Sequence, residues 1–573
     1  MAAVSGGELV VRALRKAGVS EIFGLHGAHI DSIFQACLDD GLHIYDTRNE
    51  AGAGHAAEGY ARAGHRLGVA LVTAGGGLTN AITPMANAWM DRTPVLFLTG
   101  SGTLRDDETN TLQAGLDQVA IATPVTKWAK RVQATDQIPR LIAQAVRIAL
   151  TAPCGPVLLD LPWDVLTSMV EEDDLASSGT QNLSFACPPD ATLRALLKRI
   201  TDAKRPVIII GSEASRRNSA SSIKRLVDSL GVPVFSDFEG LNQISSVEGD
   251  CYGGLLQGLN GLVKKGAEPD LVLLMGVRWG LHTGHGSPAL LPAGADIVQI
   301  DPDSRELGRL REVSTGICAD IGATLDELAR IAEETGTRVD ESWPRTMRTF
   351  IDTRLAMIRS QASTPVEGAP LHPFRASEIV ARELGSDCAW VLDGALTYLW
   401  FTELMSDLRP RSILCHGYLG SMGIGMGTAL GAQAAVKPDG RRTVLVTGDG
   451  SVGFGIAEFD AMVRHKLPVI VIVMNNQSWG ATQHFQKLAV GANRITKTML
   501  PNGRYDQAAA AFGVTPYFVD DEASLERALK SALESDGPVC INVMIDLNPI
   551  PPEELLLIGI DPFADAPTET VDG

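Results

Sequence analysis

Two polar residues, Asp449 and Asn476, each follow a short apolar run that is typical of a buried parallel strand. The first run, 444–446, leads into Gly-Asp-Gly, and the second, 469–474, leads into Asn-Asn. Apolar residues at helical spacing between them predict a crossover helix. A right-handed crossover brings the carboxyl ends of two parallel strands to one edge of the sheet, where open α/β sheets bind ligands. We therefore expect the Asp449 carboxylate and the Asn476 amide to lie close together.

A carboxylate and an amide oxygen at such an edge suit Mg²⁺, which prefers oxygen ligands and is usually completed by phosphate and water. Gly448 and Gly450 would let the backbone approach a diphosphate, and the amino end of the following helix would favour its charge. Either polar residue alone is better explained as a turn former at a strand end. The pair, flanked by glycines and joined by a helix, favours a metal–diphosphate site.

The elements that must position this pair belong to a long chain of alternating strand-like and helical stretches. With 573 residues, the chain is too long for one hydrophobic core. The alternation predicts an α/β protein with three doubly wound parallel-sheet domains. We place these domains at 1–182, 183–345 and 346–563, followed by a tail at 564–573. The polar stretch 171–182 is the first predicted linker.

Composition narrows the class of protein. The net charge of −19 argues against nucleic-acid or anionic-membrane partners. No apolar run is long enough to span a bilayer, and the first residues lack the pattern of a signal peptide. Eight cysteines without CxxC pairs fit reduced thiols and a cytoplasmic location. His282 and His285 come closest to a zinc-like spacing, but in a glycine-rich loop we interpret them as structural or solvent-facing.

The Gly-Asp-Gly sequence followed by Asn-Asn resembles the signature of thiamine-diphosphate (ThDP) enzymes. The resemblance implies ThDP and Mg²⁺ as cofactors, with Asp449, Asn476 and the Ser478 carbonyl as metal ligands. It also implies that Met422 supports the bent cofactor from below. The cofactor-binding set that it implies is Glu50, Gly394, Ala395, Met422, Gly448, Asp449, Gly450, Ser451, Asn476 and Ser478.

Glu50 matches the glutamate of that family that hydrogen-bonds the cofactor's aminopyrimidine ring and promotes loss of the reactive proton. Alone, Glu50 would be explained as an acidic residue at a helix amino end. In the family, the first domain of one subunit faces the last domain of another. The resemblance therefore implies that Glu50 and Asp449 of one site come from different chains, in a homo-oligomer that is at least a dimer and commonly a tetramer. Relatives in the family hold a nucleotide or flavin in the middle domain, but no phosphate-binding motif is present here and we expect no ligand there.

A narrower resemblance, carried by segments such as FGLHGAHID, TLQAG, DGALTYLW, NNQSWGAT and IPPEELLLIG, is to the benzaldehyde lyases. These enzymes cleave (R)-benzoin to two benzaldehydes and catalyse the reverse carboligation. The resemblance implies His29 as a proton shuttle and Gln113 as an orienting group, beside Glu50. The substrate pocket that it implies is apolar and contains Leu25, Ala28, His29, Leu112, Gln113, Trp163, Tyr398, His416, Ala481 and Phe485.

Other functions stay open. A 2-oxo acid decarboxylase of the same family would need a group that positions the substrate carboxylate, but Ala28 stands where an acid or hydroxyl would serve. A noncatalytic nucleotide-binding protein need not retain Glu50 together with Asp449 and Asn476. The GSMGIGMG stretch has dinucleotide-like spacing, but it lacks the strand and acidic residue of a dehydrogenase site.

Overall fold

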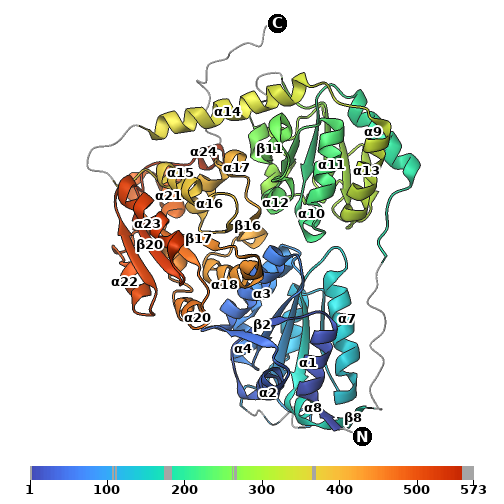
Figure 1. Ribbon diagram of the computed structural model, residues 1–573, viewed down its shortest axis with the longest axis vertical. Coiled ribbons are helices and arrows are strands. Elements are labelled where there is room, and N and C mark those ends of the chain that lie inside the picture. Colours follow the sequence, from blue (N-terminus) through green and yellow to red (C-terminus); the bar gives the residue numbers. More distant parts are fainter. Residues whose placement is uncertain are drawn as a thin grey trace.

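A computed structural model describes residues 3–105, 109, 112–172, 184–260, 262, 267–363 and 370–557. The chain forms three successive domains, each built on a parallel six-stranded sheet flanked by helices (Figure 1). The predicted doubly wound α/β architecture is confirmed. The predicted linker 171–182 lies largely, and the predicted tail 564–573 lies wholly, outside the described residues.

The N-terminal domain has the strand order β3-β2-β4-β5-β7-β6. Its central strands are apolar and buried throughout because helices cover both faces of the sheet. The strands are β2 (Glu21–Gly24), β3 (His43–Asp46), β4 (Gly68–Val72), β5 (Val95–Ser101), β6 (Trp128–Arg131) and β7 (Val157–Pro162). The main helices are α1 (Gly6–Lys16), α2 (Asp31–Asp40), α3 (Glu50–Gly64), α5 (Ile82–Met90) and α7 (Ile138–Leu150). An antiparallel ribbon of β1 (Ala3–Ser5) and β8 (Met169–Glu171) pairs the start of this domain with its end.

The C-terminal domain has the strand order β16-β15-β17-β18-β20-β19. Counted in chain order, this is the same topology as that of the N-terminal domain. Its strands are β15 (Ala389–Asp393), β16 (Ser412–Cys415), β17 (Thr443–Gly448), β18 (Ile470–Asn475), β19 (Thr515–Val519) and β20 (Val539–Met544). Its main helices are α15 (Pro373–Leu384), α16 (Ala395–Thr402), α18 (Gly425–Val436), α20 (Glu458–Arg464), α21 (Gly480–Val490), α22 (Tyr505–Ala510), α23 (Glu522–Glu534) and α24 (Pro552–Leu557). The strand order reverses between β15 and β17, so their carboxyl ends frame the crevice in which such sheets bind ligands.

The prediction of a single crossover helix between β17 and β18 is wrong, because this segment contains two helices. The structure has a four-residue helix, α19 (Asp449–Val452), then turns at 453–457, and only then α20. The interruption coincides with the sequence Gly453-Phe454-Gly455, because two glycines weaken a helix.

The middle domain has the strand order β11-β10-β9-β12-β13-β14 and lies beside the C-terminal domain in Figure 1. Its strands are β9 (Pro206–Ile210), β10 (Val234–Ser236), β11 (Tyr252–Leu255), β12 (Leu271–Met275), β13 (Asp296–Asp301) and β14 (Thr315–Cys318). Its helices include α9 (Asp190–Asp202), α10 (Ser212–Arg216), α11 (Ala220–Leu230) and α13 (Ile321–Thr335). The long helix α14 (Ser342–Ala362) leads from this domain toward the C-terminal domain (Figure 1).

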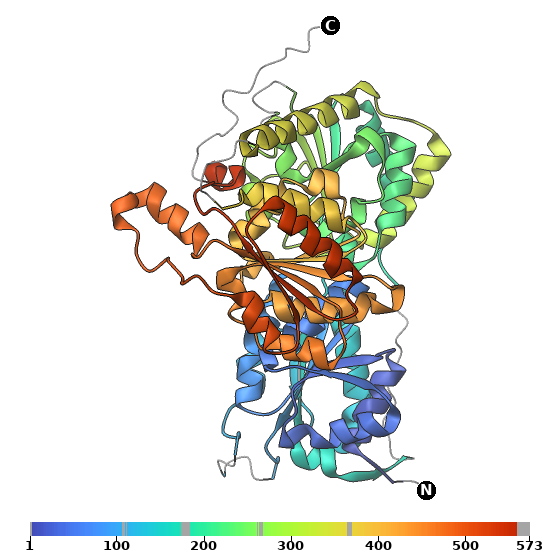
Figure 2. The ribbon, with the colours of Figure 1, turned by 60° about the vertical axis from the view of Figure 1, so that its left-hand side comes forward.

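Helices α3 and α18 pack against each other between the two terminal domains. Figure 2 shows this contact where the blue α3 meets the orange α18. A Cβ atom on Gly431 would lie 1.8 Å from the Ala56 carbonyl oxygen, and one on Gly59 would lie 2.2 Å from that of Thr428. The backbones of the two helices are therefore in direct contact, which only glycine allows at these positions.

Arg62 of α3 is buried where the three domains meet. Its guanidinium donates to the Cys415 carbonyl at 2.9 Å and pairs with Glu239 of the middle domain. Glu58 and Asp91 lie 3.6 and 3.8 Å from the same guanidinium. Burial raises the pKa of Asp91 to about 8, and the neighbouring Glu239 adds to this effect.

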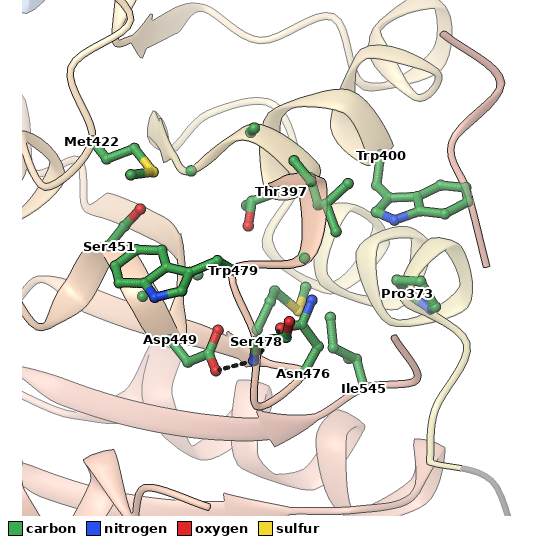
Figure 3. A pocket seen from close by; sticks show the side chains of 18 of the residues that line it. Pro373, Thr397, Trp400, Met422, Asp449, Ser451, Asn476, Ser478, Trp479 and Ile545 are labelled. Carbon is green, nitrogen blue, oxygen red and sulfur yellow. Dashed lines mark hydrogen bonds between the residues drawn. The ribbon is translucent and has the colours of Figure 1, made fainter. Parts of the chain in front are cut away.

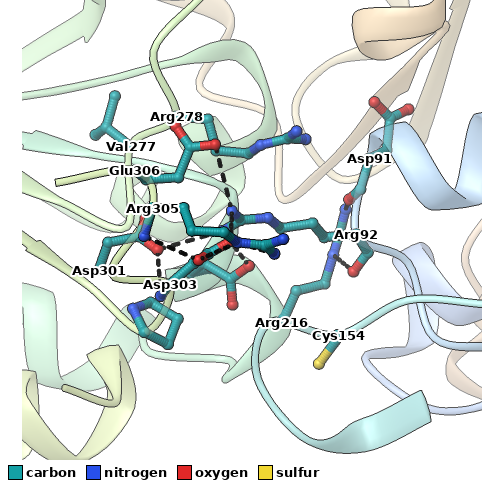
Figure 4. A network of polar contacts seen from close by, with 12 residues as sticks. Asp91, Arg92, Cys154, Arg216, Val277, Arg278, Asp301, Asp303, Arg305 and Glu306 are labelled. Carbon is teal, nitrogen blue, oxygen red and sulfur yellow. Dashed lines mark hydrogen bonds and ion pairs between the residues drawn. The ribbon is translucent and has the colours of Figure 1, made fainter. Parts of the chain in front are cut away.

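A second buried cluster joins the N-terminal and middle domains (Figure 4). Arg92 extends from the end of α5 to Glu213 at 3.1 Å, Asp301 at 3.4 Å and Asp303 at 3.3 Å. Burial raises the pKa of Asp301 to about 7. Both clusters lie between domains, so these buried ion pairs fix the domains relative to one another. Among the described residues, no helix combines the length and apolar character that crossing a bilayer requires.

Candidate functional site

A pocket lies at the carboxyl ends of β15, β17 and β18 in the C-terminal domain, at the predicted sheet edge (Figure 3). It contains Asp449 and Asn476 together, as the sequence predicted. Every residue of the predicted cofactor-binding set in this domain lines it: Gly394, Ala395, Met422, Gly448, Asp449, Gly450, Ser451, Asn476 and Ser478. Ala481 of the predicted substrate pocket lines it as well.

Asp449 is buried at the start of α19, and the loop after β18 closes over its carboxylate. The Ser478 N–H donates to Asp449 Oδ2 at 3.2 Å and to Asn476 Oδ1 at 3.1 Å. Burial raises the pKa of Asp449 to about 6, although backbone N–H groups partly offset this effect. A cation beside Asp449 would stabilise the ionised carboxylate, so the donor set suits an oxygen-liganded metal.

Hydrogen bonds to Gln483 hold the loop that carries Ser478 in place. Ser478 Oγ donates to Gln483 Oε1 at 2.7 Å, and Thr498 Oγ1 reaches the same oxygen at 2.9 Å. Gln477 has φ +58°, a left-handed conformation that non-glycine residues adopt infrequently. This turn directs the Ser478 N–H toward Asp449 and leaves the Ser478 carbonyl available as a ligand.

Gly448 and Gly450 both line the pocket, but the absence of a side chain serves a different steric purpose at each position. Gly448 has φ −79°, and a Cβ there would meet only Thr397 Oγ1, at 3.9 Å. Its missing side chain therefore leaves room inside the pocket itself, as a bound diphosphate needs. Gly450 instead makes room for protein, because a Cβ there would lie 2.4 Å from the Trp479 ring.

Asp393, at the end of β15, fixes the loop that bears Met422. Its buried carboxylate accepts the N–H groups of Gly423 at 3.0 Å and Gly425 at 2.8 Å. Burial raises the pKa of Asp393. Met422 is 44% exposed and points into the pocket above Ser451 in Figure 3, where an absent ligand could contact it.

A second group of predicted residues gathers at the carboxyl ends of the N-terminal strands. Glu50 is the first residue of α3, is only 8% exposed, and accepts a hydrogen bond of 2.9 Å from Asn80 Nδ2. A Cβ on Gly77 would lie 3.4 Å from Glu50 Oε1, and one on Gly75 would lie 3.1 Å from Gln113 Cβ. Gln113 has φ +60°, so this loop is also strained.

His29 belongs to the same sheet edge. Its Cβ would lie 2.7 Å from a Cβ placed on Gly100, at the end of β5. Its Nδ1 atom is buried without a hydrogen-bond partner among the described residues. The residue as a whole is only half-buried, so the rest of its side chain is open to the strand edge.

Among the described residues, the two groups do not line one common pocket. None of Glu50, His29 and Gln113 is among the residues lining the C-terminal pocket. We refer to these two groups of predicted residues, one on each terminal domain, as the two half-sites.

The remaining predicted substrate residues are spread over several surfaces. Leu112, Trp163 and Phe485 are 80%, 46% and 61% exposed. Leu25 is half-buried and Ala28 is exposed. Tyr398 and His416 form a ring contact at 5.5 Å, and Tyr398 also packs on Phe238 of the middle domain at 4.8 Å.

Sequence reasoning missed several residues of the pocket. Trp479 follows the ligand loop directly, and its place beside the Asn-Asn motif was the one available signal. Leu396, Thr397, Trp400, Met474, Gly480 and Thr482 lie within two positions of predicted site residues. Pro373, Ser377 and Ile545 come from segments that only the fold brings to the pocket.

Comparison with known proteins agrees with this geometry. Residues 4–121, 193–328 and 393–543 match the N-terminal TPP binding, central and C-terminal TPP binding domains of thiamine pyrophosphate enzymes. The chain is 30% identical to 2-hydroxyacyl-CoA lyase 2 of Danio rerio, covering 94% of this chain and 91% of that protein. It is 28% identical to 2-hydroxyacyl-CoA lyase 1 of Mus musculus, over 95% and 94% of the two chains. It is 27% identical to the acetolactate synthase isozyme 2 large subunit of Escherichia coli K12, over 95% and 96%.

The matches cover all three domains in the order in which the structure places them, and the two that bind the cofactor are those that carry the half-sites. They indicate thiamine diphosphate as the cofactor. The chain belongs to the thiamine pyrophosphate enzyme family.

Proposed function

We propose that the protein is a ThDP- and Mg²⁺-dependent carbon–carbon lyase that cleaves (R)-benzoin-type acyloins to aromatic aldehydes and catalyses the reverse carboligation. The observation that carries this proposal is the chemistry of the pocket wall. Among the described residues that line the pocket, Asp449 is the only ionisable one, and it is assigned to the metal. The remaining wall is glycine, alanine, larger apolar side chains and a few neutral polar groups, which suits an uncharged substrate.

Asp449, Asn476 and the Ser478 carbonyl would hold Mg²⁺, and the room at Gly448 would admit the diphosphate. When bound, ThDP supplies a nucleophilic carbon and an electron sink for cleavage of the bond beside a carbonyl. Met422 would support the cofactor from the opposite side of the pocket.

Glu50 would hold a proton at the cofactor's pyrimidine ring, with Asn80 keeping its carboxylate in place. His29 would accept the proton of the acyloin hydroxyl as the carbon–carbon bond breaks. Gln113 would orient the same oxygen or an ordered water. Leu25, Ala28, Leu112, Trp163, Tyr398, His416, Ala481 and Phe485 would surround the phenyl groups.

These roles require the two half-sites to face each other. Since they do not line one common pocket among the described residues, we propose that Glu50 of one subunit meets Asp449 of another in a homo-oligomer, with a dimer of dimers as the expected assembly. The exposure of Leu112 and Phe485 agrees with burial by a second subunit.

Three other reactions are the alternatives. The names of the relatives indicate an acetolactate synthase or a 2-hydroxyacyl-CoA lyase. A 2-oxo acid decarboxylase is the third alternative. Each of these substrates carries a carboxylate or phosphates, for which the C-terminal half of the site offers no cation among the described residues. Ala28→Ser would restore a hydroxyl near the reacting carbon and is expected to raise benzoylformate decarboxylation at the expense of benzoin cleavage. Unchanged benzoylformate turnover in that variant would contradict this role of position 28.

The test is to supply the protein with ThDP and Mg²⁺ and to follow benzaldehyde release from (R)-benzoin by absorbance. Parallel assays contain benzoylformate, pyruvate or a 2-hydroxyacyl-CoA. Benzoin cleavage that disappears in Glu50→Gln, while ThDP binding is retained, would support both the reaction and the role of Glu50. Turnover of a charged substrate alone would overturn the proposal.

We also propose a cytoplasmic location. All eight cysteines are free, as expected of a reducing compartment.

A further inference from the structure

The imidazole of His484 joins three segments of the C-terminal domain. It projects from α21, is 3% exposed, and has a partner at each ring nitrogen. Nδ1 lies 2.9 Å from Glu554 Oε2 on α24, and Nε2 lies 2.6 Å from the Leu547 carbonyl oxygen.

With Glu554 as a carboxylate, both partners act only as acceptors. A carbonyl oxygen has no proton to donate, and neither has an ionised carboxylate. Each ring nitrogen must therefore carry a hydrogen, so the contacts select the imidazolium form of His484. Burial lowers the pKa of His484, but the hydrogen bonds to Glu554 and to Leu547 outweigh it and leave the pKa above its usual value.

The other charged groups near the ring do not replace these partners. Lys487 lies one turn further along α21 and opposes the charge of His484. Glu553, the neighbour of Glu554, pairs instead with Arg354 at 2.7 Å. Asp546, close to Leu547, accepts from the backbone N–H of Asn548 at 3.0 Å. Of the elements packed on α21, η13 (Ala492–Arg494) offers only an exposed arginine, and α16 has no charged residue.

The helix that His484 holds forms part of the pocket. Gly480, Ala481 and Thr482 of α21 line it, and Gln483 anchors the hydroxyl of Ser478. A Cβ on Gly480 would lie 3.3 Å from Leu547 Cδ1, so the segment that accepts from Nε2 packs on the same wall. A shift of α21 would therefore move both the pocket wall and the ligand loop.

We propose that His484 is a positioning residue. In its doubly protonated form it connects α21 and the pocket wall to the C-terminal helix α24; we call this connection the clasp. The clasp opens when the ring loses a proton. The effect on acyloin binding rests on the proposed function, whereas the clasp itself does not. Both contacts exist together only while both nitrogens carry hydrogen. One of them is therefore lost as the pH rises through the raised pKa.

Two substitutions of one residue separate this role from simple packing. In Glu554→Gln, a neutral His484 can donate from Nε2 to Leu547 and accept from the glutamine N–H at Nδ1, so the clasp no longer needs the second proton. In Glu554→Ala the partner is absent at every pH. Asp46→Asn is the matched control, because it alters the carboxylate 2.9 Å from a different histidine, His465.

The measurement is hydrogen exchange of α21 peptides in the full chain at pH 6.5 and pH 9.5, corrected for intrinsic rates. Wild type and Asp46→Asn should lose protection at high pH by roughly tenfold for each unit by which the folded-state pKa exceeds that of the unfolded chain. Glu554→Gln should stay protected at both pH values, and Glu554→Ala at neither. Equal pH dependence in wild type and Glu554→Gln, or none in wild type, would overturn the proposal.

A second measurement links the clasp to the site. The KM for benzoin should rise with pH in wild type and not in Glu554→Gln, with kcat changing less than KM. If benzoin is not a substrate, the proposed function fails, but the exchange measurements still decide the role of His484.

Discussion

Asp449 Oδ2 accepts a hydrogen bond of 3.2 Å from the Ser478 N–H, across 29 positions of sequence. This contact holds the loop after β18 against the end of β17. It therefore fixes the positions of the three proposed metal ligands relative to one another. It also explains why the loop needs the left-handed Gln477, since the chain must turn back toward Asp449.

Asp449→Asn should weaken ThDP binding in the presence of Mg²⁺ by at least roughly tenfold, because an amide cannot supply the ligand charge. Isothermal titration of ThDP into protein and Mg²⁺ measures this loss. Asp460→Asn, which alters an acid that pairs with Arg464 outside the pocket, is the control and should bind normally. Equal affinities in the two variants would contradict the assignment of Asp449.

Gly450→Ala should reduce both stability and cofactor affinity. The new methyl group would lie 2.4 Å from the Trp479 ring, and overpacking of this kind costs about 1–3 kcal/mol. Thermal unfolding and ThDP titration both report the effect. Adding Trp479→Leu should recover part of the lost stability. If the double variant is no more stable than Gly450→Ala, the contact with Trp479 is not the cause.

Glu458 gives the native state a pH dependence. It lies on α20, accepts the Arg48 N–H at 3.1 Å just before α3, and burial raises its pKa to about 7. Because the folded-state pKa lies above the ordinary value, the native state is most stable with Glu458 protonated and loses stability as the pH rises from about 4.5 to about 7. The loss is at most roughly 3 kcal/mol.

Glu458→Gln removes this titration, so its thermal stability relative to wild type should increase between pH 5 and pH 8. Differential scanning calorimetry at the two pH values tests the sign. A relative stability that falls over this range would refute the assignment.

Arg62→Met should destabilise the chain strongly, because Glu58, Asp91 and Glu239 would lose their shared cation in a buried site. Breaking a buried pair in this way typically costs about 3–5 kcal/mol. Arg12→Ala, which removes an exposed pair with Glu172, should cost about 1 kcal/mol or less. Denaturant unfolding of the two variants measures the difference, and comparable losses would show that Arg62 is not the hub of this cluster.

How much of the site could be predicted depended on which interactions fix each residue. Asp449 and Asn476 follow apolar runs that can only be neighbouring buried strands, so their common edge was predictable from sequence. Trp479 was not, because its contact with Gly450 depends on the backbone turn at Gln477. Pro373 and Ile545 reach the pocket from opposite ends of the domain, and no local pattern records that approach. The break between α19 and α20 was missed because apolar spacing continues through glycines that interrupt the helix.

The backbone contact between α3 and α18 also limits which sequence changes the protein can accept during evolution. Gly59 and Gly431 leave no gap that a larger residue could occupy, so each helix is shaped to the other. A recombination that replaced one terminal domain with a relative's would bring together two helices that had not diversified jointly. Poor packing between the two helices would displace Glu50, the first residue of α3. The two terminal domains are therefore expected to be inherited as a pair.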